Sequence, residues 1–258
     1  MGGAGPVARL GTAPDRRRPV IHVLKRHSLP IVAHFRHSLV LTYAFPRETL
    51  EPLVPPGLEL DVLGDLGFAA VALVETQALR PAGLPRVLER DFFLVGYRIF
   101  VRRGSLRGLR ILRSETDSLV VARLGNALTR YGWRRVGIRR RDEPPAYEVQ
   151  TTSGLHVVAD LRPGPLPEGS PFADEREARR FAGPLPYTFE HEPETGALVV
   201  VRGVRSRWKP QPVGIQVLRN DFVDELGGGS LANAFHVGGV DYRWERGRVL
   251  RAPVLTAA

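Results

Sequence analysis

The residues from Arg113 to Tyr131 combine acidic, basic and amide side chains that could transfer a proton or bind an anion. Alternation along a strand would place Arg113 and Glu115 on the same face. Glu115 or Tyr131 could then act in proton transfer, and Asn126 could bind a ligand through its amide. A buried pair of Arg113 and Glu115 that bridges two strands would explain the same pattern without catalysis. Both interpretations remain open from these residues alone.

Metal and thiol chemistry are disfavoured by the sequence. His34 and His37 have a spacing found among metal ligands, but residues three apart in a strand point to opposite faces, so we expect no metal site. The sequence contains no cysteine, which excludes disulfides, thiol nucleophiles and thiolate metal sites. Zinc-protease, serine-hydrolase and phosphate-loop motifs are absent, and we expect no cofactor.

A strand, a short helix and a proline turn follow one another between residues 35 and 61. Large apolar residues alternate with smaller ones over residues 38–45, which predicts a strand with one larger apolar face directed at a core. Pro46 is suited to the first position of a helix because its missing N–H is not needed there. The Pro-Pro-Gly sequence at residues 55–57 predicts the turn that ends this unit.

Short strands dominate the rest of the chain. One short helix is expected over Asp174–Phe181, where acids in the first turn and arginines in the last match the helix dipole. Because strands are many and strand–helix alternation is irregular, we predict a mainly β (α+β) fold with antiparallel packing. The further strands are expected at Gly67–Leu79, Phe93–Val101, Gly108–Ser114, Leu119–Leu124, Tyr147–Thr152, Leu155–Leu161, Gly196–Gly203, Pro212–Leu218 and Phe235–Trp244.

One family resemblance rests on these motifs. The order of Arg36, an alternating strand, the helix ETLEPLVP and the exit PGLELD resembles the acetoacetate-decarboxylase-like superfamily. Within it, the closer resemblance is to the uncharacterised YqjF-like family, domain of unknown function 2071. Arg98, the sequence WKPQP and the closing FHVGGVD follow in the same order, so the resemblance covers roughly residues 35–249. It implies a closed or cone-like antiparallel β-barrel with a small-molecule pocket, in which Arg36 would bind a carboxylate.

The resemblance also indicates a change in the chemistry of that pocket. In acetoacetate decarboxylases a buried lysine forms a Schiff base with a β-keto acid, and a neighbouring lysine lowers its pKa. Arg130 and Tyr131 stand where the resemblance places those two lysines. Arginine stays protonated and cannot form an imine, so imine-forming decarboxylation at this position is excluded. Glu89 falls near the pocket glutamate of the superfamily, while a second pocket acid is replaced by Ala69.

Two further departures concern the lysines and the strand that carries Arg98. The YqjF-like pattern has Pro-Glu-Leu-Asn where this chain reads Phe-Leu-Val-Gly at residues 93–96, and only Arg98 is retained. The chain has two lysines, Lys25 and Lys209. We expect Lys25 to be solvated and Lys209 to lie on a surface turn, so neither is expected to replace the missing amine.

The net charge of +10 is concentrated near the N-terminus. Residues 1–37 hold seven Lys or Arg and one acid, which accounts for +6. We therefore expect a basic, mobile arm over residues 1–33 and a single domain over residues 34–258. Nucleic-acid binding is disfavoured and is kept only as a second alternative. The absence of a long apolar run or a signal peptide predicts a cytoplasmic protein without a membrane segment.

Two functions from different classes agree with these observations. The first is a small-molecule binding protein whose pocket holds a small anion, a carboxylate or keto acid, at Arg36, Arg98, Arg130 and Asn126, without a Schiff-base lysine. The alternative is an enzyme on carbonyl or carboxylate compounds, with Glu89, Glu115 or Tyr131 in acid–base catalysis. The resemblance is also compatible with a homodimer.

Overall fold

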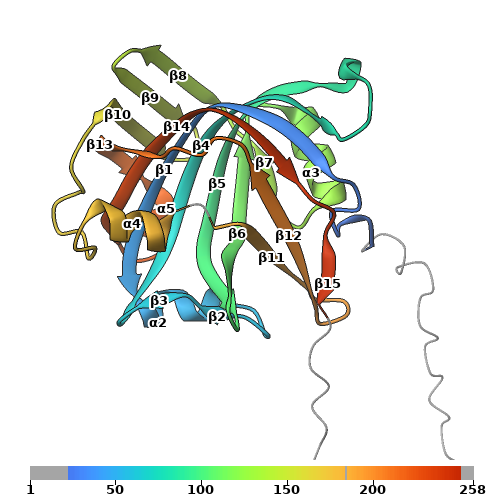
Figure 1. The fold of residues 1–258 in the computed structure, drawn as a ribbon, viewed down its shortest axis with the longest axis horizontal. Helices are drawn as coiled ribbons and strands as arrows, with labels where there is room; N and C mark the ends of the chain where they lie inside the picture. Colours follow the sequence, from blue (N-terminus) through green and yellow to red (C-terminus); the bar gives the residue numbers. More distant parts are fainter. Residues whose placement is uncertain (1–22, 184, 251–258) are drawn as a thin grey trace, which may run out of the picture.

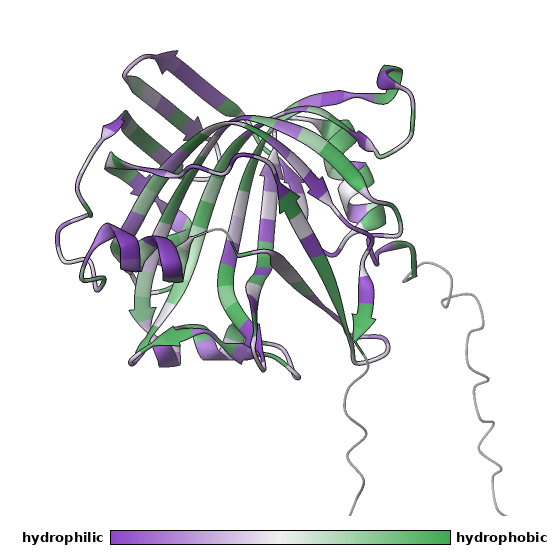
Figure 2. Ribbon diagram, viewed as in Figure 1, coloured by the Kyte–Doolittle hydropathy of each residue, from purple (hydrophilic) through white to green (hydrophobic). Residues whose placement is uncertain are grey.

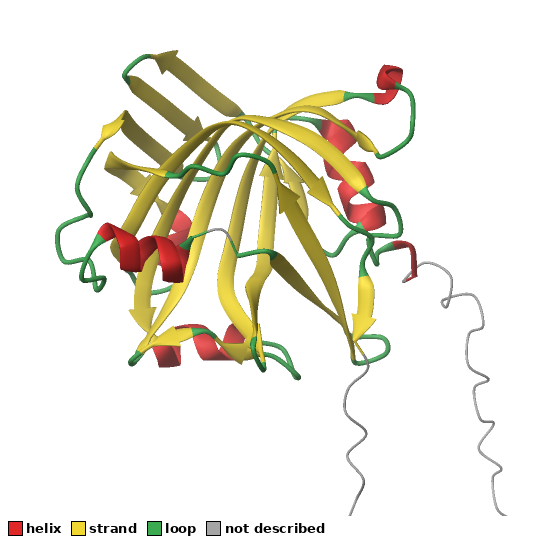
Figure 3. Ribbon diagram, viewed as in Figure 1, coloured by secondary structure: helices red, strands yellow, loops and turns green. Residues whose placement is uncertain are grey.

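The computed structural model describes residues 23–183 and 185–250 of the chain, and its regular structure is mostly strand, as Figures 1 and 3 show. The predicted mainly β (α+β) fold is confirmed. Residues 1–22 of the expected arm lie outside the described residues, and the first strand already begins at Ile31. No helix in residues 23–183 and 185–250 is long and apolar enough to cross a membrane.

The elements have the following bounds. The strands are β1 (Ile31–Pro46), β2 (Glu59–Leu60), β3 (Val62–Leu63), β4 (Leu66–Pro81), β5 (Arg90–Arg103), β6 (Leu106–Thr116), β7 (Trp133–Arg135), β8 (Ile138–Glu143), β9 (Ala146–Thr151), β10 (Leu155–Pro163), β11 (Tyr187–Glu192), β12 (Ala197–Arg205), β13 (Gln211–Asn220), β14 (Ser230–Trp244) and β15 (Arg248–Leu250). The helices are α2 (Arg47–Leu50), α3 (Leu119–Leu128), α4 (Glu175–Ala182) and α5 (Asp221–Glu225), with 3-10 turns η1 (Glu51–Leu53) and η2 (Arg86–Leu88).

Seven strands form a closed ring. Their order is β12, β11, β6, β5, β4, β1 and β14, and pairing of β14 with β12 completes it. Neighbours in the ring are antiparallel except β6 and β11, which are parallel. The strands β13, β10, β9 and β8 continue from β14 as a branch. Closing the ring satisfies the backbone hydrogen bonds that open sheet edges would leave free.

The two faces of the ring strands differ in side-chain size. On β4, Val71 and Leu73 belong to the largest apolar cluster, which the branch strands β9 and β10 share, whereas Ala70 and Ala72 face the ring interior. The larger face of β1 packs in that same cluster, as predicted from its alternation. Figure 2 shows hydrophobic stretches along β1, β4 and β5 and hydrophilic ones on β8 and α4. Small inner side chains leave room for longer polar ones inside the ring.

Helix α4 covers the interior at the open front of the ring, as seen in Figure 1. Its buried residues Ala178 and Ala182 pack with Phe68 and Phe100 from the inner faces of β4 and β5. The helix begins after Asp174, whose side chain accepts a hydrogen bond from the backbone of Glu177. The predicted helix at Asp174–Phe181 is therefore confirmed to within its ends.

The predicted strand at Leu119–Leu124 is wrong, because helix α3 occupies these residues. The Ser118 side chain accepts a hydrogen bond from the Val121 backbone, which caps the helix at its N-terminus. A short apolar run does not distinguish a strand from a helix by periodicity alone. In the helix, Val121 is buried while Leu124 is exposed.

Candidate functional site

Arg98 lies inside the ring of strands. It pairs with Ala70 across β5 and β4, and both residues are on the inner face. Tyr242 on β14 and Arg205 on β12 both influence its pKa, although each strand is three places from β5, in opposite directions around the ring. Only a side chain that projects into the interior can be close to both strands. The ring therefore holds a guanidinium near its centre.

The surroundings of Arg98 do not balance its charge. A Cβ atom on Gly96 would lie 2.8 Å from Nη2 of Arg98, so the glycine lets the guanidinium lie against the backbone. Burial lowers the pKa of Arg98 to about 10, which leaves it charged at neutral pH. Within the described residues its Nε atom makes no hydrogen bond and the guanidinium forms no ion pair. A buried cation without a counter-ion is costly unless a ligand supplies the anion.

Glu190 on β11 brings a buried acid to the same interior. Thr188 of β11 pairs with the inner residue Leu109 of β6, and Glu190, two residues further along β11, lies on the same face of the strand. Glu190 is 8% exposed and its Oε2 atom has no hydrogen-bond partner in the part of the chain described. Burial raises the pKa of Glu190 to about 8, although a hydrogen bond from the Arg130 backbone and the charges of Arg130, Arg110 and Lys25 act to lower it. Glu190 is therefore poised to gain or lose a proton near neutral pH.

Tyr131 connects these two groups electrostatically. It follows α3 and is buried, and its ring centroid lies 5.2 Å from that of His27. Its hydroxyl has no hydrogen-bond partner among the described residues. Burial raises the pKa of Tyr131 well above its ordinary value; Glu190 adds to this, and Arg98 opposes it. Tyr131 is thus a neutral hydrogen-bond donor that lies close to both Arg98 and Glu190.

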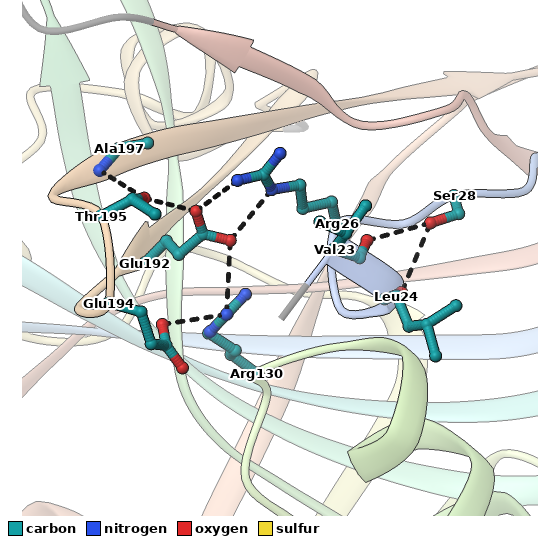
Figure 4. Close-up of polar contacts among 9 residues, drawn as sticks. All are labelled: Val23, Leu24, Arg26, Ser28, Arg130, Glu192, Glu194, Thr195 and Ala197. Atoms are coloured by element: carbon teal, nitrogen blue, oxygen red, sulfur yellow. Dashed lines mark hydrogen bonds and ion pairs between the residues drawn. The ribbon is translucent and has the colours of Figure 1, made fainter. Parts of the chain in front are cut away.

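Arg130 makes ion pairs at one end of the ring, as Figure 4 shows. Its Nη2 atom lies 3.4 Å from Oε1 of Glu192 and 3.1 Å from Oε2 of Glu194. Arg26 binds the same Glu192 carboxylate with both Nε and Nη2, at 2.9 and 2.5 Å, and Thr195 also donates to it. The hydrogen bond from Arg26 lowers the pKa of Glu192 to about 2. Arg130 is therefore held by protein carboxylates.

Arg36 does not join Arg98. It lies at a bulge of β1, and its side chain is 52% exposed. Its guanidinium contacts Glu75 at 3.1 Å and Asp142 of β8 at 3.2 Å. Two protein carboxylates therefore already bind the Arg36 guanidinium, which the family resemblance assigned to a ligand carboxylate.

Glu115 lies on the opposite face of the ring from Arg98, and its carboxylate is fully occupied. The Tyr97 hydroxyl and the Ser153 hydroxyl donate to Oε2 at 3.0 and 2.6 Å, and Arg113 Nε lies 3.2 Å from Oε1. Arg113 and Glu115 share a face as predicted, but they pair along β6 and not between two strands. The hydroxyl of Ser153 makes the link from β6 to the β9–β10 turn.

Glu89 and Asn126 are also outside the interior group. Glu89 lies 3.4 Å from Arg80, beside the η2 turn. Asn126 exchanges two hydrogen bonds with the backbone of Trp133, at 2.8 and 3.0 Å, which fix α3 to β7. Of the residues proposed from the sequence, Arg98 and Tyr131 interact inside the ring, whereas the Arg130 side chain is bound by Glu192 and Glu194. Across residues 23–183 and 185–250, no group of three or more His, Asp or Glu side chains could hold a metal ion.

The fold and sequence of this chain match known protein groups. A model of the family DUF2071, described as an uncharacterized conserved protein, matches residues 32–237. The chain belongs to the DUF2071 family. Residues 32–237 include β1 to β13 and most of β14, so the match covers both Arg98 and Glu190. A search of curated proteins finds no match.

Solved structures share the fold at low sequence identity. Acetoacetate decarboxylase from Legionella pneumophila is 12% identical, with a TM-score of 0.62 and coverage of 86% of this chain and 87% of that one. An acetoacetate decarboxylase-like enzyme from Sphingomonas wittichii RW1 is 14% identical, with a TM-score of 0.57 and coverage of 89% and 96%. The enduracididine biosynthesis enzyme MppR, complexed with pyruvate, is 12% identical, with a TM-score of 0.53 and coverage of 95% and 98%. At these identities the likeness establishes the fold.

Proposed function

We propose that the ring interior binds a small carboxylate, of the keto-acid class, with Arg98 as its anion partner. The observation that carries this proposal is the half-buried guanidinium of Arg98, whose buried Nε atom has no hydrogen-bond partner and which forms no ion pair within residues 23–183 and 185–250. A carboxylate would supply the missing charge and accept two hydrogen bonds from the planar guanidinium. One of the structural neighbours agrees with this class, since it is the enzyme MppR complexed with pyruvate.

Binding in the interior is proposed to be non-covalent. Lys209 is exposed on the loop between β12 and β13. Lys25 is half-buried at the end of the ring, where its charge acts on Glu190. The described titratable residues that influence the pKa of Arg98 are Tyr131, Arg205 and Tyr242, none of which carries a primary amine. Without such an amine, an imine cannot form beside Arg98.

Replacing Arg98 should abolish ligand binding while leaving the fold intact. We expect wild-type protein to bind pyruvate or acetoacetate in calorimetry, and Arg98→Met to bind at least 10-fold more weakly, because a charged hydrogen bond contributes about 1.5–3 kcal/mol. Gly96→Ala should also weaken binding, since its Cβ would displace the Arg98 guanidinium. Arg98→Met removes a half-buried charge that has no ion-pair partner among the described residues, so it should not lower the melting temperature.

Arg36→Ala is the matched control for this experiment. Arg36 is exposed and lies outside the ring interior, so its replacement should leave ligand affinity within about twofold of wild type. If neither keto acid binds wild-type protein, or if Arg98→Met binds as tightly as wild type, the proposed carboxylate site is wrong. Loss of binding in Arg36→Ala alone would move the site to the outer face.

Borohydride trapping should leave the protein mass unchanged. Incubation with acetoacetate and sodium borohydride reduces any imine to a stable adduct, which mass spectrometry detects. We expect no adduct, because neither lysine lies beside Arg98. An adduct mapped to Lys25 or Lys209 would contradict non-covalent binding and would identify the amine that forms the imine.

A further inference from the structure

Two unsatisfied polar groups lie on the inner side of the ring, and one of them, Tyr131, interacts electrostatically with Arg98. The Oε2 atom of Glu190 and the hydroxyl of Tyr131 are both buried and both lack hydrogen-bond partners within the described residues. Tyr131 interacts electrostatically with Glu190 on one side and with Arg98 on the other. A buried polar atom without a partner is rare in folded proteins and indicates a functional role or a bound ligand. Tyr131 therefore links the acid and the cation on the inner side of the ring.

We propose that Glu190 is a general base that removes a proton from the carbon next to the ketone of a keto acid held by Arg98. This inference rests on the proposed carboxylate site. The carboxylate of Glu190 takes the proton, and the electron pair of the C–H bond forms the C=C bond of an enolate while the carbonyl π pair moves to oxygen. Tyr131 donates a hydrogen bond to that oxygen. Return of a proton from Glu190 regenerates the keto acid, so the step consumes no oxidant or co-substrate.

The other buried glutamates are unsuited to this step. Glu192 is bound by Arg26, Arg130 and Thr195, and its pKa is lowered to about 2, which makes it a weak base. Glu115 accepts hydrogen bonds from Tyr97 and Ser153 on the opposite face of the ring. Glu190 is the buried acid with an unoccupied oxygen in the part of the chain that the structure describes.

The pKa of Glu190 also suits the role of a general base. A catalytic acid or base works best when its pKa is close to the working pH. Burial raises the pKa of Glu190 to about 8, so protonated and ionised forms are both populated at neutral pH. The rate of proton removal should therefore increase with pH and level off above about pH 8.

Exchange of the methyl protons of pyruvate in deuterium oxide tests the proposal. Proton NMR should show that the pyruvate methyl signal is lost faster with wild-type protein than in buffer alone. The rate should increase with pH and level off above about pH 8. Glu190→Gln should reduce this acceleration at least 100-fold, since general-base catalysis contributes about 10²–10⁴. Tyr131→Phe should reduce it about 10-fold, with pyruvate affinity nearly unchanged. Glu194→Gln, an exposed acid close in sequence, should exchange at the wild-type rate.

The possible outcomes distinguish the general-base role of Glu190 from carboxylate binding at Arg98. Binding of pyruvate without faster exchange, or wild-type exchange in Glu190→Gln, would overturn the general-base role and leave the binding site intact. Failure of pyruvate to bind would overturn both. Glutamine has nearly the same shape as the protonated glutamate, so circular dichroism and calorimetric affinity should show that Glu190→Gln remains folded and binds pyruvate. If Glu190→Gln lost both proton exchange and folding, Tyr131→Phe would decide the question. The proposal requires that Tyr131→Phe exchange the pyruvate protons more slowly while binding pyruvate with wild-type affinity.

Discussion

Replacing Glu192 by glutamine should lower the free energy of unfolding at pH 7 by about 3–5 kcal/mol, because it removes a buried carboxylate that pairs with Arg26 and Arg130 and leaves Arg26 without an acidic partner. The Glu192 side chain is 0% exposed and accepts hydrogen bonds from Arg26 and Thr195, while Arg130 lies 3.4 Å away. Through these contacts, Glu192 on β11 connects that strand to the segment before β1 and to the segment that follows α3. Breaking a buried pair on one side costs more than the pair itself contributes.

Chemical denaturation of wild type and Glu192→Gln measures this effect, and Glu194→Gln provides the matched control. Glu194 pairs with the same Arg130 but is 53% exposed, so its replacement should cost less than 1 kcal/mol. The pKa of Glu192 is about 2, below the ordinary 4.5, so its stabilisation is present above about pH 4.5 and is lost as pH falls toward 2. Equal stability of the two variants at pH 7 would show that the Glu192 pairs contribute nothing.

Alternation and turn residues were sufficient to predict most ring strands. The larger apolar face of β1 could be predicted because it depends on the size of alternating side chains. The Ser-Gly turn between β9 and β10 could be predicted because it depends on the backbone geometry of a few residues. The strand prediction for Leu119–Leu124 failed because this apolar run has no clear period. Its helical structure is decided by packing against β7. Strand β11 was missed, although Thr188, Glu190 and Glu192 alternate with Tyr187, Phe189 and His191 in the sequence.

The site was harder to predict because it depends on which face of each strand points into the ring. Arg36 and Arg98 are both arginines on long strands, but a bulge directs Arg36 toward Glu75 and Asp142 outside the ring. A one-residue change of register moves a side chain to the other face, and bulges are not visible in the sequence. Tyr131 was named from the resemblance, whereas Glu190 required the β6–β11 pairing, which joins residues about 80 positions apart.

Glu190 should give the protein a pH dependence of stability opposite to that of Glu192. Burial raises the pKa of Glu190 to about 8, against an ordinary value of 4.5. The folded protein therefore holds a proton that the unfolded chain releases above about pH 4.5. The resulting stabilisation is complete below pH 4.5 and is lost as the pH rises through 8, by roughly 5 kcal/mol in total.

Glu190→Gln removes this titration and isolates its contribution. Denaturation of the variant and wild type between pH 5 and 9 should show nearly equal stability at pH 5, with the variant more stable by about 4–5 kcal/mol at pH 9. Glu194→Gln should follow the wild-type curve, because Glu194 is exposed. A difference between Glu190→Gln and wild type that stays constant from pH 5 to 9 would mean that folding does not change the protonation of Glu190 in that range, which would contradict its raised pKa. An increasing difference would instead show that burial raises the pKa of Glu190 toward neutral pH, where its ionised form can accept a proton and its protonated form can return one, as proton transfer requires.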